Sequence, residues 1–179
     1  MDRTSIEALL PFAAGGFTVR ARSREDINRR ADWPPYPEAY SMFNTTRARV
    51  PPDRLEAGWA RMKAEADILL LSAEHPDETL VATFSLRDID WAGMAVGNMG
   101  VRLHPGWCDR GVGSALSAAI FDWCLDAGFR SLRLDVLGSN GRARRCYEKA
   151  GMAVAGSFER DGAEFLWMER RADSAGQGA

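Results

Sequence analysis

Short stretches in which hydrophobic residues alternate with polar ones, or form brief apolar runs, recur along the chain, as is typical of β-strands. They predict strands over residues 17–22, 68–72, 79–86, 98–103, 131–136, 154–158 and 164–168. Turn-forming residues at 75–78 and 160–162 predict that the second and third of these strands, and the last two, form hairpins. Residues 1–16 carry no such pattern, so we expect a loosely placed lead-in.

Between these strands, apolar residues recur every three or four positions, which predicts amphipathic helices. The helical segments fall near 23–31, 38–43, 53–66, 114–127 and 141–150, and the clearest has Leu116, Ile120, Trp123 and Ala127 on one face. This order of strands and helices predicts a mixed α/β fold in a single domain over residues 17–171. Residues 172–179 are small and polar, so we expect a disordered tail.

The strand at 98–103 and the helix at 114 are joined by a glycine-containing loop with the features of a phosphate cradle. Gly111 and Gly113 let the backbone approach a ligand closely, and the free N–H groups of the first helical turn favour an anion. A Walker loop would continue with Gly-Lys-Ser/Thr, which this sequence does not have. A dinucleotide-binding fingerprint would need glycine where the chain has Leu116. From these residues alone, a plain strand-to-helix turn is an equal interpretation.

Composition narrows the functional classes. The chain has 179 residues, 46% of them hydrophobic, and a net charge of −2, whereas nucleic-acid-binding domains usually show a basic excess. Cys108, Cys124 and Cys146 have neither disulfide-framework nor zinc-ligand spacing. No apolar run is long enough to span a membrane, and residues 1–15 lack a secretory signal. We therefore expect a cytoplasmic protein with no metal, nucleic-acid or membrane partner.

Two motifs, in this order and with a strand between them, carry a family resemblance. The first is Leu103-His104-Pro105 followed by Arg110-Gly111-Val112-Gly113 and Leu116, and the second comprises Asn140, Ala143, Tyr147, Lys149, Gly151 and Met152. Together they resemble the GNAT superfamily of N-acetyltransferases, and within it the RimI/RimJ-like enzymes. The resemblance implies a twisted six- to seven-stranded mixed sheet flanked by helices, with acetyl-coenzyme A as the acyl donor.

In that family the first motif binds the pyrophosphate of acetyl-coenzyme A. The resemblance therefore implies a set of donor-binding residues: Val101, Arg102, Leu103, Asp109, Arg110, Gly111, Val112, Gly113, Ser114, Asn140, Arg142, Ala143 and Tyr147. Cys108 departs from the pattern, because the family usually has Gln or Arg there, which weakens a flank of the loop rather than its backbone contacts. His104 occupies the family's ordinary His-Pro position, so we expect a structural role.

The resemblance also implies catalytic roles. Tyr147 is the candidate general acid for the departing thiolate, with a buried packing tyrosine as the alternative. Asp135 lies where RimI-like enzymes have the glutamate proposed as the base, with a polar residue that faces a neighbouring strand as the alternative. A backbone N–H near Val101, where its strand separates from the next one, is expected to polarise the thioester.

The acceptor is the part that the sequence determines least. The aromatic, proline-rich segment 33–37 contains Trp33 and Tyr36 and fits either a packed loop or a lid over the substrate. An enclosed aromatic pocket favours a small primary amine over a protein N-terminus, with direct attack in a ternary complex. The alternative function is a module that binds acetyl-coenzyme A without turnover. Both a monomer and a homodimer fit the sequence.

Overall fold

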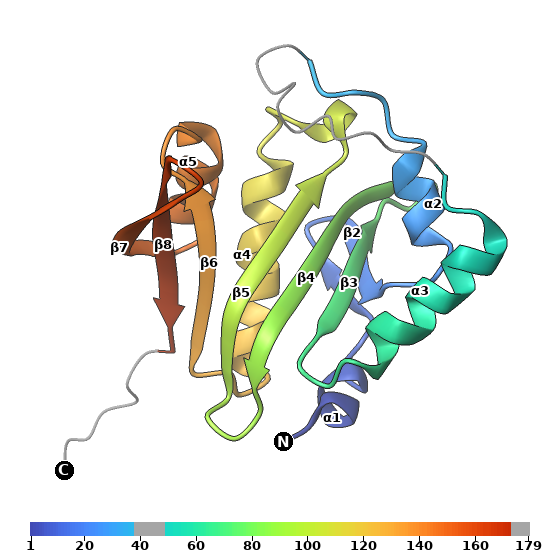
Figure 1. Ribbon diagram of the computed structural model, residues 1–179, viewed down its shortest axis with the longest axis horizontal. Helices are drawn as coiled ribbons and strands as arrows, with labels where there is room; N and C mark the ends of the chain where they lie inside the picture. Colours follow the sequence, from blue (N-terminus) through green and yellow to red (C-terminus); the bar gives the residue numbers. More distant parts are fainter. Residues whose placement is uncertain (38–48, 173–179) are drawn as a thin grey trace.

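An eight-stranded, mostly antiparallel sheet carries helices on both of its faces (Figure 1). The computed structural model describes residues 1–37 and 49–172. The strands lie in the order β1-β2-β3-β4-β5-β6-β8-β7. Their bounds are β1 Phe12–Ala14, β2 Phe17–Ala21, β3 Leu69–Glu74, β4 Leu80–Asp90, β5 Ala95–Leu103, β6 Ser131–Leu137, β7 Ala153–Arg160 and β8 Ala163–Arg171. The helices are α1 Arg3–Glu7, α2 Asp26–Ala31, α3 Pro52–Ala64, α4 Val112–Asp126 and α5 Gly141–Lys149, with a 3-10 turn, η2, at Pro105–Trp107.

The two faces of the sheet differ in character. The register aligns Leu71, Phe84 and Val101 across β3, β4 and β5, and this apolar face shares one core with α4. α4 lies behind the sheet in Figure 1, whereas α2 and α3 lie in front. Side chains of a strand alternate between faces, so the next residue of each strand lies on the front face. These residues, Ser72, Thr83 and Arg102, are polar and lie side by side.

The sheet opens between β5 and β6, the only parallel pair among the strands described. These strands pair only at Ala95–Ser131 and Val96–Leu132, and then diverge (Figure 1). The opening begins beside an irregularity, where Gly97 lies opposite Asp88, whose φ is +52°. A Cβ on Gly97 would come within 3.0 Å of the Asp88 backbone oxygen. The expected separation of the 98–103 strand from its neighbour is therefore confirmed.

The first residues are better ordered than a loose lead-in, so that expectation was wrong. Asp2 caps α1 by accepting a hydrogen bond from the Ser5 N–H, and Ile6 is fully buried in the core. β1 pairs with β2, and the Phe12 ring stacks on Trp123 of α4 at 5.2 Å. With β1 included, the sheet has eight strands instead of the expected six or seven.

The other expected strands and helices that fall on described residues are present, with shifted ends. β5 begins at Ala95 instead of Asn98, and α4 begins at Val112, two residues before Ser114. The helix expected over 38–43 and all but the first residue of the expected tail lie outside the described residues. In the described part of the chain, no helix has the length and apolar character needed to cross a membrane.

Candidate active site

A cavity of about 400 Å³ lies where β5, the start of α4 and one side of α5 meet, at the wide end of the gap between β5 and β6. Most residues expected to bind the donor line it. The lining comprises Tyr36, Val101, Arg102, Leu103, Cys108, Asp109, Gly111, Gly113, Ser114, Asn140, Arg142, Ala143, Arg145, Cys146, Tyr147 and Lys149. The two sequence motifs, separate in the chain, thus form one site.

The loop before α4 has the geometry of an anion cradle. Gly111 caps the helix with φ +77°, a left-handed conformation that glycine adopts without strain. Gly111 has no side chain that could cap the helix, so the N–H groups of the first turn, including those of Gly113 and Ser114, receive no acceptor from their N-cap residue. These donors, with the positive end of the helix dipole, suit the phosphates of a coenzyme A donor.

α5 supplies the charged side of the cavity. Asn140 caps this helix through Oδ1, which accepts a hydrogen bond from the Ala143 N–H at 3.1 Å. Arg142, Arg145 and Lys149 lie at helical spacing along the side of α5 that lines the cavity. With Arg102 they give the lining four cations against one acid, Asp109, which lies 3.2 Å from Arg142. A polyanionic donor is therefore favoured.

The sequence did not predict donor-binding roles for Arg145, Cys146 or Lys149. The spacing of Arg142, Cys146 and Lys149, four and then three residues apart, was the available signal, because it places all three on one helical face. Two expected donor residues, Arg110 and Val112, are not part of the lining. The Arg110 guanidinium instead lies 5.9 Å from the Trp107 ring centroid.

Tyr147 lies in the cavity wall, and its neighbours determine its protonation. Burial raises the pKa of Tyr147 well above its ordinary value near 10, an effect to which Cys146 adds and which Arg102 opposes. Its phenol therefore remains protonated throughout the neutral and mildly alkaline range. A protonated hydroxyl in the cavity wall has the form that a general acid needs before it donates a proton.

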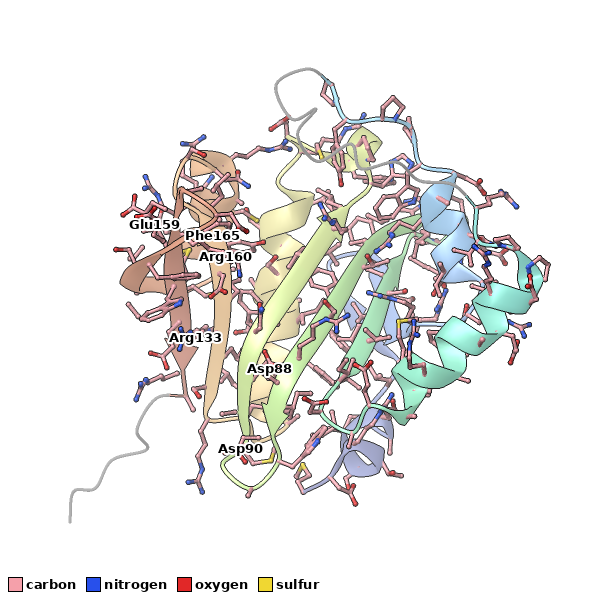
Figure 2. All side chains as sticks on the ribbon, in the orientation of Figure 1. Asp88, Asp90, Arg133, Glu159, Arg160 and Phe165 are labelled. Atoms are coloured by element: carbon pink, nitrogen blue, oxygen red, sulfur yellow. The ribbon has the colours of Figure 1, made fainter. Side chains whose placement is uncertain are left out.

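Asp135 does not line this cavity. On β6 it lies opposite Trp167 of β8, and its Oδ2 is 3.9 Å from the Arg160 guanidinium. Arg160, labelled in Figure 2, lies 4.1 Å from the ring centroid of Phe165. Asp135 therefore faces the neighbouring strand and an arginine, on the side of the sheet opposite to the core residues Leu134 and Val136.

The aromatic segment before residue 38 packs against the end of β5. Tyr36 lines the cavity, and its hydroxyl donates a hydrogen bond of 2.6 Å to the Leu103 carbonyl. Trp33 is buried but does not line the cavity, and its ring meets His104 edge-on at 5.4 Å. His104 accepts the Gly106 N–H through Nδ1 at 3.0 Å, so it holds the turn that leads to the cradle.

Comparison with known protein families agrees with this geometry. A sequence model described as the acetyltransferase (GNAT) family matches residues 28–152, which include both motifs. The chain belongs to this family. Acetyl-coenzyme A is the acyl donor of its enzymes, and the cavity's cradle and cations fit that donor. No curated protein sequence matches the chain significantly.

Solved structures of family members share the fold. A spermidine N-acetyltransferase SpeG chimera from Vibrio cholerae and hSSAT has 18% sequence identity and a TM-score of 0.73, with 88% of this chain and 96% of that chain covered. The Vibrio cholerae spermidine N-acetyltransferase in complex with CoA and spermine has 18% identity and a TM-score of 0.68, with 87% and 95% covered. At this identity the likeness extends to the fold alone.

Proposed function

We propose that the protein is an N-acetyltransferase that transfers the acetyl group of acetyl-coenzyme A to the primary amine of a small molecule. The observation that carries this proposal is the single cavity shared by the Gly111 cradle and the Tyr147 hydroxyl. In this proposal the cradle binds the phosphates of the donor, and Tyr147, in the wall of the same cavity, serves its thiol group.

The proposed reaction is direct attack in a ternary complex. The neutral amine nitrogen attacks the thioester carbonyl carbon, the C–N bond forms, and the C–S bond breaks. The leaving thiolate takes the proton of the Tyr147 hydroxyl, while the amine loses a proton to a base or to water. A backbone N–H of β5 near Val101 stabilises the oxyanion, because β6 no longer pairs with that part of β5.

Asp135 is the candidate base in this proposal, acting directly or through a water molecule. Its location supports an acceptor-side role, because it projects from the face of β6 opposite to the core and not into the donor cavity. Its Oδ2 lies 3.9 Å from the Arg160 guanidinium. Water alone is the alternative proton acceptor.

Two observations support a small-molecule acceptor. Tyr36 lines the cavity and its hydroxyl bonds to the Leu103 carbonyl, which places an aromatic side chain in the wall of the site. The structural neighbour from Vibrio cholerae is described in complex with spermine, a small amine. The RimI/RimJ-like resemblance rests on donor-side motifs, so it leaves a protein N-terminus as the competing acceptor within this proposal.

The test is the release of free coenzyme A thiol from acetyl-coenzyme A against a panel of primary amines and N-terminal peptides, with donor binding measured in parallel by calorimetry. Release that depends on a small amine is the expected result. Release with peptides only would identify protein N-termini as the acceptor. Donor binding without release would identify a module that binds acetyl-coenzyme A without turnover, and absence of both would contradict the donor site.

A further inference from the structure

The front face of the sheet, opposite to α4, carries a partly buried arginine that takes no part in the donor cavity. Arg22 follows β2, and its Nη2 donates to the backbone carbonyls of Leu71, at 3.2 Å, and Phe84, at 2.7 Å. Its Nε is buried and has no hydrogen-bond partner. Within residues 1–37 and 49–172, no carboxylate lies at ion-pair distance from this guanidinium.

The carboxylate that acts electrostatically on Arg22, that of Asp26, is already occupied by other donors. Asp26 is fully buried and accepts hydrogen bonds from Arg20, Arg29, the Ser23 N–H and the Ser72 hydroxyl, at 2.7 to 3.0 Å. These bonds account for the acceptor capacity of one carboxylate. Asp26 therefore serves to anchor α2 to β2 and β3 and does not neutralise Arg22.

Other charges near Arg22 are cationic. Burial lowers the pKa of Arg22 to about 10, and Arg30 and Arg87 add to this effect, with Asp26 opposing it. Asp88 and Asp90 lie toward the end of β4 away from the cavity (Figure 2). An accompanying anion would stabilise a partly buried charge of this kind.

Arg22 lies one strand away from the expected reaction centre. Phe84, whose carbonyl it contacts, is the register partner of Val101, and neighbouring strands are about 4.8 Å apart. Between them the front face carries Ser85 and Gly100, which are also register partners and add little bulk. The donor cavity is lined by the start of α4 and by α5 and does not include Arg22, so an acceptor that binds Arg22 would reach β5 from the front face.

We propose that Arg22 binds an oxyanion of the acceptor, so that the preferred substrates are primary amines that also carry a carboxylate or phosphate, such as amino acids. This inference rests on the proposed acetyltransferase function and specifies its acceptor. It distinguishes this protein from an enzyme for polyamines, whose cations would meet Arg22 and Arg87 on the same face. Arg22 is then a specificity-determining residue and does not take part in proton transfer.

The experiment compares kcat/KM for matched acceptors in the thiol-release assay. One set is an amino acid, its amide and its decarboxylated amine. A second set pairs an aminoalkyl phosphonate with the same amine lacking the phosphonate, and spermidine is included. We expect about a 10- to 100-fold advantage for the acceptors with an oxyanion, the range of a charge-assisted hydrogen bond. The two sets separate a carboxylate site from a phosphate site.

Arg22→Gln removes the charge but keeps an amide that can donate to the carbonyls of Leu71 and Phe84. We expect it to raise KM for the acceptors that carry an oxyanion and to abolish their advantage. The kcat for amines without an oxyanion and the affinity for acetyl-coenzyme A should be unchanged. Arg22→Lys keeps the charge and retains part of the advantage. The matched control is Arg24→Gln, an exposed arginine paired with Glu25 and Glu56, which leaves the preference intact.

A wild-type enzyme that prefers spermidine or amines without an oxyanion overturns this inference and leaves the proposed function standing. The same holds if Arg22→Gln keeps the full oxyanion preference. If Arg22→Gln fails to fold, the wild-type panel and Arg22→Lys still decide the matter. Absence of thiol release with every amine contradicts the proposed function itself, and the acceptor class with it.

Discussion

The donor side and the acceptor side of the proposed site are built in different ways. The donor side comes from two continuous stretches, the turn from Leu103 to Ser114 and the helix α5 that follows Asn140. The acceptor side is assembled from separate strands, with Arg22 after β2, Ser85 on β4 and Asp135 on β6. The first uses backbone N–H groups and a row of cations, whereas the second uses single side chains.

This difference has a chemical basis. A pyrophosphate is bound by a helix terminus and loop backbone, which need only a particular local conformation, here the left-handed Gly111. An acceptor is distinguished by the position of one charge or one apolar group, which any neighbouring strand can supply. Substitutions on the donor side should therefore abolish binding of acetyl-coenzyme A, and those on the acceptor side should change which amine is used.

Gly111→Arg should have the largest effect on the donor side. The side chain fills the cradle and forces a left-handed conformation on a residue with a Cβ, so acetyl-coenzyme A affinity falls by at least about 100-fold. Calorimetric titration measures the loss. Gly111→Ala is the matched control, because open space surrounds that Cβ and only the backbone strain remains. Equal affinity in Gly111→Arg and wild type would mean that the phosphates bind elsewhere.

Tyr147→Phe should have the next largest effect, and it tests the chemistry of the donor side rather than its affinity. Loss of the proton donor lowers kcat by about 100-fold with nearly unchanged acetyl-coenzyme A affinity. Because burial raises the pKa of Tyr147, the phenol is neutral from pH 6 to its ordinary pKa near 10, and the loss should be uniform over that range. Full activity in this variant would leave Tyr147 a packing role only.

The contrast between the two sides also decided what could be predicted from the sequence. Each of the two motifs is local, and their resemblance to the GNAT family implied that Gly111, Gly113, Asn140 and Tyr147 bind the same donor. All four line the cavity. The apolar runs at 68–72 and 79–86, with turn residues between them, predicted the central hairpin, whereas the opening beside β5 was implied by the family resemblance. The motifs and the hairpin depend on the chemistry of neighbouring residues.

Long-range features were not predictable in this way. The alternating Phe17–Arg22 stretch predicted a strand. Nothing local indicated that the Arg22 guanidinium would donate to the Phe84 carbonyl and keep a buried Nε without a hydrogen-bond partner. The packing of Ile6 and Phe12 could not be predicted from the sequence, because the core residues and Trp123 that they contact are distant in the chain. Pairing across a sheet depends on which strands meet, and periodicity within one strand does not contain that information.

Asp135→Asn tests the acceptor side with a smaller effect. If Asp135 takes the proton of the amine, kcat/KM falls by about tenfold in this variant. Arg160→Gln is the companion variant, because it removes the guanidinium 3.9 Å away but keeps the carboxylate, so it separates loss of the base from loss of the ion pair. An unchanged kcat/KM in Asp135→Asn would identify water as the proton acceptor.

The smallest expected effect is on the donor side: the affinity for acetyl-coenzyme A should depend on pH through the titration of His104. Burial lowers the pKa of His104 below its ordinary 6.5, and its unprotonated Nδ1 accepts the Gly106 N–H before the cradle. A lowered pKa in the folded state means that this bond is intact above pH 6.5. It is lost as the pH falls through the folded-state pKa, because the protonated ring has no acceptor at Nδ1.

Acetyl-coenzyme A affinity should therefore weaken by about two- to threefold between pH 7 and pH 5 in excess of the titration of the ligand's own phosphates. His104→Asn isolates this excess, since an asparagine carbonyl can accept the Gly106 N–H at any pH and the ligand contributes equally to both proteins. The difference between the two affinity profiles measures the turn alone. A difference that does not change with pH would show that the cradle keeps its shape without the His104 bond.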